Sequence, residues 1–453
     1  MLLIKNGHVI DPKSHLSAKR DILIENDKIK AISENIEVKE NCEIIDAEGM
    51  YVTPGLIDVH VHFRDPGFTY KEDIFTGAEA AKAGGFTTVV MMANTNPAID
   101  NIETLDYVLE RANKTDIKVL SCGDITKGLK GKELVDMAAL KERGAVGFTD
   151  DGIPLMDAEL LRGAMKEALK LDVPLSFHEE DLKYNVNNGI NHGKASEHFN
   201  IGGADRQAEI SMMDRDLKMA IEEGARCDFQ HVSAKESINL IYESKAKLLK
   251  SKGIDILRFD FTKDTDISAV PQISLEDAFS VNIHAEATPN HFTLTEDDVI
   301  KHGALAKINP PIREEADRLA IIRGLKANAI DLIVTDHAPH SKEEKSKPIT
   351  EAPSGIIGLE TSLALAVTSL VKPGYLSYEE VIPKMTINPA KLYHLDAGYL
   401  DENGPADITI FKEEEWTPSE YKSKSDNTPF TGRTLSAKVK YTICDGKIVY
   451  KDN

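Results

Sequence analysis

The feature that most restricts the fold is a regular alternation of two kinds of segment through the middle of the chain. Short apolar and β-branched runs, typical of buried strands, alternate with amphipathic stretches that have helical spacing, at 72–84, 103–114, 157–170, 205–224 and 315–328. Eight β/α units predict a closed (β/α)8 TIM barrel, with an open doubly wound sheet as the alternative. The eight strand candidates are residues 56–62, 86–93, 117–125, 145–151, 173–180, 226–233, 281–289 and 330–340.

The two ends of the chain differ from the middle. Residues 1–54 and 392–453 both contain short β-type runs broken by turn residues, and near the C-terminus Asp445-Gly446 separates two alternating runs as a hairpin turn does. We therefore expect a small β-sandwich domain built from both termini, beside a catalytic barrel domain at 55–391. The interval at about 250–280 is longer than one crossover helix requires, and we interpret part of it as an inserted surface loop of unknown role.

Composition and charge argue against several classes of protein. The chain has 54 Lys and Arg against 75 Asp and Glu, a net charge of -21, which does not favour nucleic acid as a partner. No apolar run approaches the ~20 residues that span a membrane, and the N-terminus lacks a signal-peptide pattern, so a cytoplasmic protein is expected. The cysteines lack CxxC spacing, and we interpret them as buried reduced thiols: Cys42, Cys122, Cys227 and Cys444.

Side chains that bind metals collect at the ends of the predicted strands, where the active site of such a barrel lies. His60 and His62 alternate along the first strand and therefore point to the same side. Imidazole with carboxylate predicts one or two metal ions, best Zn²⁺, although Mn²⁺, Co²⁺ or Fe²⁺ could enter the same set. The further candidates at strand ends are Asp150 and Asp151, His178 to Asp181, His231, and Asp336 and His337.

Such a metal site predicts hydrolysis at a carbonyl group. A metal ion lowers the pKa of bound water from about 15.7 to about 7, which supplies hydroxide at neutral pH, and it also polarises the substrate carbonyl. A carboxylate that is not fully committed to the metal can carry the proton. Asp336, at the last strand end, is the candidate for this general acid and base.

Motifs along nearly the whole chain add a family resemblance. The run TPGLIDVHVHFRDPG at 53–67 resembles the characteristic motif of dihydroorotases, which are cyclic amidohydrolases of the amidohydrolase superfamily. The chain departs from the usual family motifs in MANTNP, HEED and TPNH, and none of these changes removes a proposed ligand. Other segments that resemble class I dihydroorotases are GFTTVVMMANTNP (85–97), AVGFTDDG (145–152), FHEEDL (177–182), QHVS (230–233), ATPNHFTLT (287–295), KINPPIR (307–313), IVTDHAPH (333–340), SGIIGLET (354–361) and NTPFTGR (427–433).

The resemblance implies a role for particular residues. His60, His62 and Asp336 would hold one metal ion, while Asp151, His178 and His231 would hold or bridge to a second. Related hydantoinases and allantoinases commonly use a carbamylated lysine as the bridge, so Asp151 argues against those sister activities. The residues that would contact substrate are Arg64, which matches the arginine that grips the substrate carboxylate, Asn94, Asn309 and His340, and Pro353 and Gly355 in a closing loop at 352–358.

The implied reaction is the reversible cyclisation of N-carbamoyl-L-aspartate to L-dihydroorotate, a step of pyrimidine synthesis. Three alternatives stay open at this point: an allantoinase, a dihydropyrimidinase of hydantoinase type, and an inactive dihydroorotase-like partner of aspartate transcarbamoylase. A small-molecule substrate and a homodimer are expected, and an association with aspartate transcarbamoylase is considered. His284, His291 and His302 are interpreted as structural or exposed.

Overall fold

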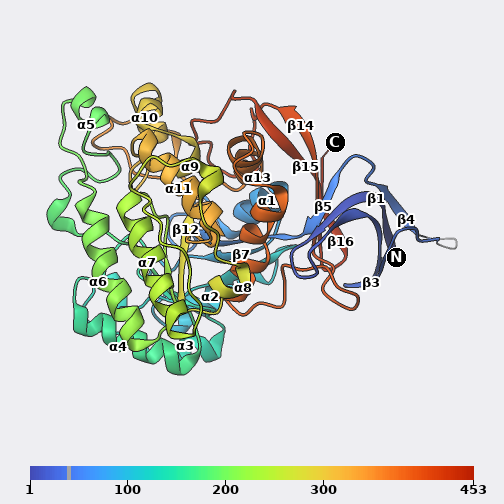
Figure 1. Ribbon diagram of the computed structural model, residues 1–453, viewed down its shortest axis with the longest axis horizontal. Coiled ribbons are helices and arrows are strands. Elements are labelled where there is room, and N and C mark those ends of the chain that lie inside the picture. Colours follow the sequence, from blue (N-terminus) through green and yellow to red (C-terminus); the bar gives the residue numbers. More distant parts are fainter. Residues whose placement is uncertain (38–41, 453) are drawn as a thin grey trace.

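The computed structural model, which describes residues 1–37 and 42–452, arranges the eight predicted strand segments in one closed ring (Figure 1). Two parallel sheets, β6-β7-β8 and β9-β10-β11-β12-β13, make up the ring. Parallel bridges from Gly123 to Phe148 and from Val61 to His337 join the sheets on both sides, so the expected barrel is confirmed. The strands are β6 (Leu56–Val61), β7 (Phe86–Met91), β8 (Lys118–Ser121), β9 (Phe148–Thr149), β10 (Leu175–Phe177), β11 (Cys227–Phe229), β12 (Ile283–Ala287) and β13 (Leu332–Ile333).

Helices lie between consecutive strands and cover the outside of the ring (Figure 1). Because both faces of the parallel strands are covered, β6 and β7 are buried at every residue, including the polar ones. The five predicted helical segments correspond to α1 (Ile74–Ala83), α2 (Ile102–Ala112), α4 (Ala158–Leu171), α6 (Gln207–Glu223) and α11 (Glu315–Ala327). The other helices are α3 (Met137–Arg143), α5 (Lys194–Phe199), α7 (Lys235–Ser251), α8 (Leu275–Ala278), α9 (Pro289–Thr293), α10 (Glu296–His302), α12 (Lys342–Lys345), α13 (Ser362–Ala366), α14 (Tyr378–Val381) and α15 (Ile387–Leu392).

The starts and ends of the barrel helices follow local chemistry. Asp73 accepts hydrogen bonds from the first free N–H groups of α1, and Asp157 does the same for α4. At the other end, Asp172 after α4 and Asn328 after α11 adopt the left-handed backbone that commonly ends a helix. These capping residues fix where each helix returns toward the next strand.

Strands from both ends of the chain form one mixed sheet beside the barrel (Figure 1). Its order is β16-β15-β14-β5-β1-β2-β3, and β4 also pairs with β1. β5 continues through Gly55 into β6, so the sheet connects directly to the first barrel strand. The domain limits at 54/55 and 391/392 stay a prediction. These strands are β1 (Leu2–Asp11), β2 (Leu16–Glu25), β3 (Lys28–Ser33), β4 (Glu43–Asp46), β5 (Tyr51–Pro54), β14 (Ile408–Trp416), β15 (Leu435–Cys444) and β16 (Lys447–Lys451).

The segment at 250–280 is mostly irregular between α7 and α8, and part of it is held against the barrel. Phe261 is fully buried, with its ring centroid 5.2 Å from that of Tyr242 on α7. Arg323 on α11 donates from Nε to the Thr265 carbonyl at 2.6 Å. Leu257, by contrast, is 75% exposed. This part of the surface is therefore held by buried apolar side chains such as Phe261 and Ile273, and its assignment as an insertion stays a prediction.

The cysteines were predicted to be buried reduced thiols. Cys122, Cys227 and Cys444 are buried and free, whereas Cys42 is free but half-exposed, so its predicted burial is wrong. Cys42 precedes the short strand β4, most of whose residues face solvent. Within residues 1–37 and 42–452, no helix has the length and apolar character needed to cross a bilayer.

We expect Phe261→Ala to lower the free energy of unfolding by about 3–5 kcal/mol, because it removes a buried aromatic ring and leaves a cavity. Leu257→Ala, in the same segment, is the matched control and should stay within about 0.5 kcal/mol of the wild type. Urea unfolding of the three proteins measures both values. Equal effects of the two substitutions would contradict the anchoring role of Phe261.

Candidate metal centre

Strand β6 and the residue that follows it present two imidazoles to the mouth of the barrel. All residues of β6 are buried, and side-chain alternation puts His60 and His62 on the same side. The His62 N–H donates to the His337 carbonyl at 2.9 Å, which ties β6 to the segment after β13. The His60 N–H donates to Asp58 Oδ1 at 3.1 Å. The predicted pair therefore lies where the first and last barrel strands meet.

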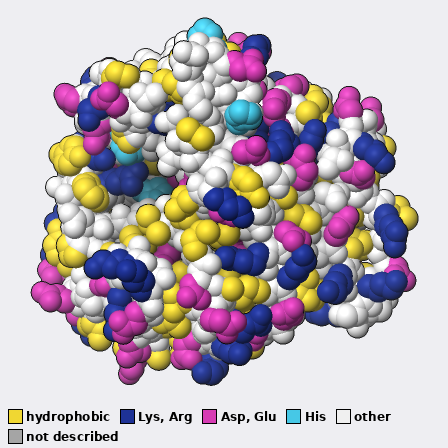
Figure 2. All heavy atoms as spheres, turned by 90° about the vertical axis from the view of Figure 1, so that its left-hand side faces the viewer, with side chains coloured by type: hydrophobic (Ala, Val, Ile, Leu, Met, Phe, Trp, Pro, Cys, Tyr) yellow, Lys and Arg dark blue, Asp and Glu magenta, His cyan; other side chains and the backbone are white. Residues whose placement is uncertain are grey.

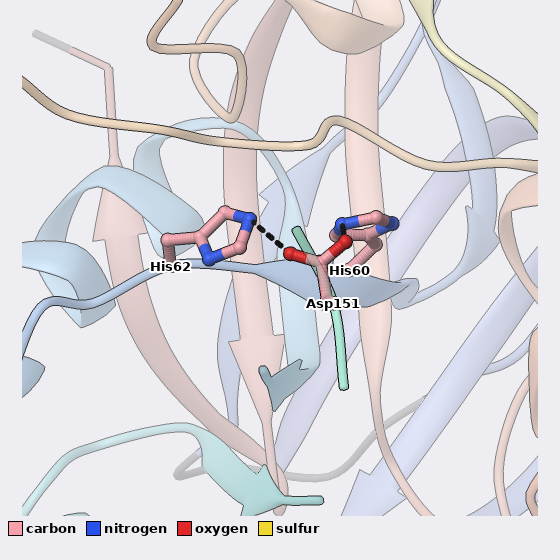
Figure 3. A group of neighbouring side chains, drawn as sticks. All are labelled: His60, His62 and Asp151. Carbon is pink, nitrogen blue, oxygen red and sulfur yellow. Dashed lines mark ion pairs between the residues drawn. The ribbon is translucent and has the colours of Figure 1, made fainter. Parts of the chain in front are cut away.

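The carboxylate of Asp151, just after β9, lies among four imidazoles. Its Oδ2 is 3.3 Å from His62 Nε2, and its Oδ1 is 3.6 Å from His60 Nε2. Oδ1 is also 3.8 Å from His178 Nδ1 and 3.7 Å from His231 Nε2. Figure 3 shows Asp151 between His60 and His62, with a ring nitrogen of each directed toward it. One carboxylate thus connects two groups of side chains.

Asp336, after β13, completes the set of six predicted ligands. Its Oδ1 is 3.1 Å from His62 Nε2 and 3.6 Å from His60 Nε2. The Asp336 side chain is 12% exposed, whereas the His60 side chain is completely buried. Asp336 is therefore within reach of a molecule that enters the mouth from solvent.

Three residues at the mouth have a left-handed backbone that is uncommon outside glycine. The φ angles are 59° for Arg64, 33° for His231 and 48° for Asp336, each shortly after a barrel strand. Such a conformation costs about 1–3 kcal/mol per residue and persists where the surroundings impose it, typically at functional sites. The backbone here is held in the shape that brings these side chains together.

Carboxylates and imidazoles polarise one another at the centre. Burial disfavours the charged form of His60, but Glu286 and Asp151 raise its pKa well above the ordinary value. Burial raises the pKa of Asp151, but His60, His231 and His62 outweigh it and hold that pKa well below the usual range. A divalent cation would replace the protons on the imidazoles and leave the carboxylates charged.

The donor atoms fit a divalent ion. His60 Nε2 is buried, and no hydrogen-bond partner lies near it among the described residues. Two groups, His60 with His62 and Asp151, and Asp151 with His178 and His231, each place their ligand atoms within 4.8 Å of one another. Imidazole nitrogen and carboxylate oxygen are ordinary ligands of Zn²⁺. The two groups share Asp151, so the geometry provides for one ion or for two.

The predicted substrate residues surround this centre, and two of them touch the predicted ligands directly. Asn94 Oδ1 is 2.9 Å from His62 Nδ1, and its Nδ2 donates to Asp151 Oδ2 at 3.1 Å. Asn309 Nδ2 lies 3.2 Å from His178 Nε2. Their amides are therefore placed to orient the ligands as well as a substrate.

Arg64, His340 and the predicted closing loop lie together. Arg64 Nε donates to the Pro339 carbonyl at 3.4 Å, next to His340. His340 Nε2 is 2.8 Å from the carbonyl of Ser354, and burial with the nearby charge of Arg64 lowers the pKa of this histidine. Gly355 has φ 145°, and a Cβ there would meet the Ala338 carbonyl at 2.7 Å. Pro353, in the same loop, accepts from Lys345 Nζ at 3.1 Å.

Sequence reasoning missed two residues that touch the His60 ring: Gln230, whose Nε2 is 3.4 Å from His60 Nδ1, and Glu286. Glu286 Oε2 is 2.8 Å from His60 Nδ1, and both side chains are completely buried. The available signal was an acidic residue inside the buried run IHAEA of β12.

Two strand-end candidates turn away from the centre. Asp150 accepts from the N–H groups of Ile125 and Thr126, and His337 Nε2 is 3.3 Å from Glu72.

Two further histidines are buried and contact groups outside the predicted ligand set. His291 Nε2 is 3.1 Å from the Pro310 carbonyl, and burial lowers the pKa of this histidine to about 4. His284 Nδ1 is 3.5 Å from Asp331. His302, which ends α10, is only partly buried.

The face of the molecule that includes α5 and α6 is hollowed. Figure 2 shows histidine and basic side chains gathered in this hollow, whereas acidic side chains are scattered over the surrounding surface. For a chain with a net charge of -21, a basic hollow is a local reversal that favours an acidic small molecule.

Comparison with known proteins agrees with this geometry. The model of the amidohydrolase family matches residues 51–449. A dihydroorotase from Clostridium acetobutylicum is 50% identical over 455 residues, covering 100% of both chains. A dihydroorotase from Streptococcus pneumoniae is 49% identical over 454 residues, again covering 100% of both.

Solved structures give the same fold at lower identity. An L-hydantoinase from Arthrobacter aurescens has a TM-score of 0.81 at 23% identity, covering 99% of this chain and 96% of that one. A dihydropyrimidinase from Brevibacillus agri has a TM-score of 0.79 at 21% identity, covering 99% and 95%. These structures support the barrel with its additional sheet, and the relatives near 50% identity narrow the assignment: the chain belongs to the amidohydrolase family and, within it, to the dihydroorotases.

Proposed function

We propose that this chain catalyses the reversible cyclisation of N-carbamoyl-L-aspartate to L-dihydroorotate, a step of pyrimidine synthesis. The observation that carries the proposal is the meeting of six side chains from five strand ends at one mouth of the barrel, around the Asp151 carboxylate. Relatives named dihydroorotases, 46–51% identical over nearly the whole chain, support it. The reaction opens or closes a cyclic amide, which is the hydrolytic chemistry expected of such a centre.

His60, His62 and Asp336 would hold one ion, and Asp151, His178 and His231 would hold or share a second. When bound, a divalent ion makes water a stronger acid and polarises the amide carbonyl. Zn²⁺ suits the nitrogen and oxygen donors best, with Mn²⁺, Co²⁺ and Fe²⁺ as alternatives. Asp151, as a shared carboxylate, would keep the imidazoles of both groups facing the same point.

Asp336 is placed to move the proton in both directions of the reaction. Burial raises its pKa, but the hydrogen bond to His62 and the charges of His60 and His62 lower it overall, so the carboxylate is ionised at neutral pH. In hydrolysis it would accept a proton from the attacking water and deliver it to the departing ring nitrogen. In cyclisation the same carboxyl group would take the proton from the attacking nitrogen.

Arg64 would bind the carboxylate that distinguishes dihydroorotate from simple dihydropyrimidines. A guanidinium and a carboxylate form two parallel charge-assisted hydrogen bonds, which fix orientation as well as position. Arg64, His340 and the loop with Pro353 and Gly355 lie side by side at the mouth. Asn94 and Asn309 would add amide contacts to the substrate.

The rival activities receive less support from these residues. The solved hydantoinase and dihydropyrimidinase are 21–23% identical to this chain, so they bear on the fold alone. An inactive partner of aspartate transcarbamoylase is disfavoured because all six ligand positions are retained. A homodimer and an association with that enzyme remain proposals.

We expect Asp336→Asn to lower kcat by about 10²–10⁴-fold, because an amide cannot accept or return the proton. Steady-state assays in both directions measure the loss. Circular dichroism and bound-metal analysis serve as controls and should show a folded, loaded protein. Near-normal turnover in that protein would remove Asp336 from the mechanism.

We expect Arg64→Lys to raise KM for dihydroorotate by about 10–100-fold, since a charge-assisted hydrogen bond contributes about 1.5–3 kcal/mol. Dihydrouracil, which lacks the carboxylate, is the matched control substrate, and its KM should not change. Arg433→Lys, at an exposed arginine, is the control variant. A wild-type enzyme that prefers dihydrouracil would instead favour the dihydropyrimidinase alternative.

We expect removal of metal with a chelator such as dipicolinate to abolish turnover, and Zn²⁺ to restore it, with one or two ions bound per chain. The loss of ions should also lower the melting temperature, because a ligand at 1,000 times its Kd stabilises the fold by about 4 kcal/mol. Elemental analysis and thermal unfolding check both points. Full activity in protein shown to be metal-free would contradict the proposed function.

A further inference from the structure

A buried carboxylate contacts the ring of His60 on the side away from the centre. Glu286, on β12, is completely buried, and its Oε2 is 2.8 Å from His60 Nδ1. In Figure 3 one ring nitrogen of His60 is directed toward Asp151, and the other points away from it. The ring thus has one nitrogen for each of two carboxylates.

The short contact settles where the imidazole proton lies. An ionised carboxylate can only accept a hydrogen bond, so its approach to 2.8 Å places the ring proton on Nδ1, and the Gln230 amide lies farther from that atom, at 3.4 Å. In the neutral ring Nε2 is then a lone-pair donor, and it is the buried atom with no hydrogen-bond partner among the described residues. The His60 ring is therefore held with its free nitrogen facing the shared centre.

A glutamate is an unusual residue at this buried position. The interior of such a barrel is normally filled by branched apolar side chains. Burying a carboxylate is costly unless strong donors pair with it. The side chain of Glu286 contacts the His60 ring and, at 3.4 Å, the backbone N–H of His231, which are residues of the centre, and it also lies beside the buried acid Asp228.

Other ring nitrogens in the same centre have different partners. His62 Nδ1 faces the neutral amide oxygen of Asn94 at 2.9 Å. His178 Nε2 faces Glu180 at 3.3 Å, a carboxylate near the mouth. The Glu286 contact is shorter than both, and its two side chains are completely buried, so water does not compete for the hydrogen bond.

We propose that Glu286 is a positioning residue that fixes the tautomer and orientation of His60, so that Nε2 is the atom offered to the metal ion held with His62 and Asp336. The inference rests on the metal site of the proposed function. Partners of this kind raise the basicity of a ligating histidine, and their loss typically weakens metal binding by about 10–100-fold.

The test compares metal affinity in wild type, Glu286→Gln and Glu286→Asp, starting from apoprotein in each case. Competition between the protein and a chromophoric chelator measures Kd for Zn²⁺, and the absorption spectrum of Co²⁺-loaded protein reports the ligand geometry. We expect Glu286→Gln to raise Kd of one ion by about 10–100-fold and to alter the Co²⁺ spectrum. Glu286→Asp keeps the charge, so its Kd should lie between that of the wild type and that of Glu286→Gln.

Glu72→Gln is the matched control, because Glu72 is an equally buried carboxylate 3.3 Å from a histidine, His337, that turns away from the centre. It should leave Kd and the Co²⁺ spectrum unchanged. If Glu286→Gln fails to fold, Glu286→Asp decides by the same measurements. An unchanged Kd in a folded Glu286 variant would overturn this inference alone, whereas a wild type that binds no metal would overturn the proposed function.

Discussion

Closure of the barrel is the constraint on which the rest of the structure depends. The bridge from Val61 to His337 joins the first strand to the segment after the last, and it brings His62 within 3.1 Å of Asp336, 274 residues away in the chain. An open sheet would leave these two residues at opposite edges. The hydrophobic filling and the helices that close the ring are therefore also what assembles the centre.

Much of the fold could be predicted because each barrel strand can be recognised from its own residues. A parallel strand covered on both faces is a short apolar run, and the ends of parallel strands meet at one edge, so the positions of His60 and Asp336 in the sequence already imply proximity. Strand limits were less predictable. The structure confines β9 to Phe148–Thr149, within a segment predicted at 145–151, because hydrogen bonding rather than hydrophobicity ends a strand.

The residues that escaped prediction act through contacts that no local pattern encodes. Glu286 belongs to β12, and only the ring closure places it against His60, 226 residues earlier. Cys42 was predicted to be buried by its neighbouring strand, but β4 lies at the side of β1 with most residues exposed. The orientation of His337 away from Asp336 likewise follows from its pairing with Glu72. Pairing partners distant in sequence decide all three cases.

Polar side chains inside the barrel lie next to the residues of the centre. Burial and the nearby Glu286 raise the pKa of Asp228 well above its ordinary value, so these two buried acids interact directly. Ser176 Oγ, 3.3 Å from Asp228, continues the chain to Tyr393 at 3.2 Å. A buried hydrogen-bond network lowers the stability of the fold unless each of its polar groups has a partner. The network reaches His60 through Glu286, so the stability that it costs is offset by a ligand held in one orientation.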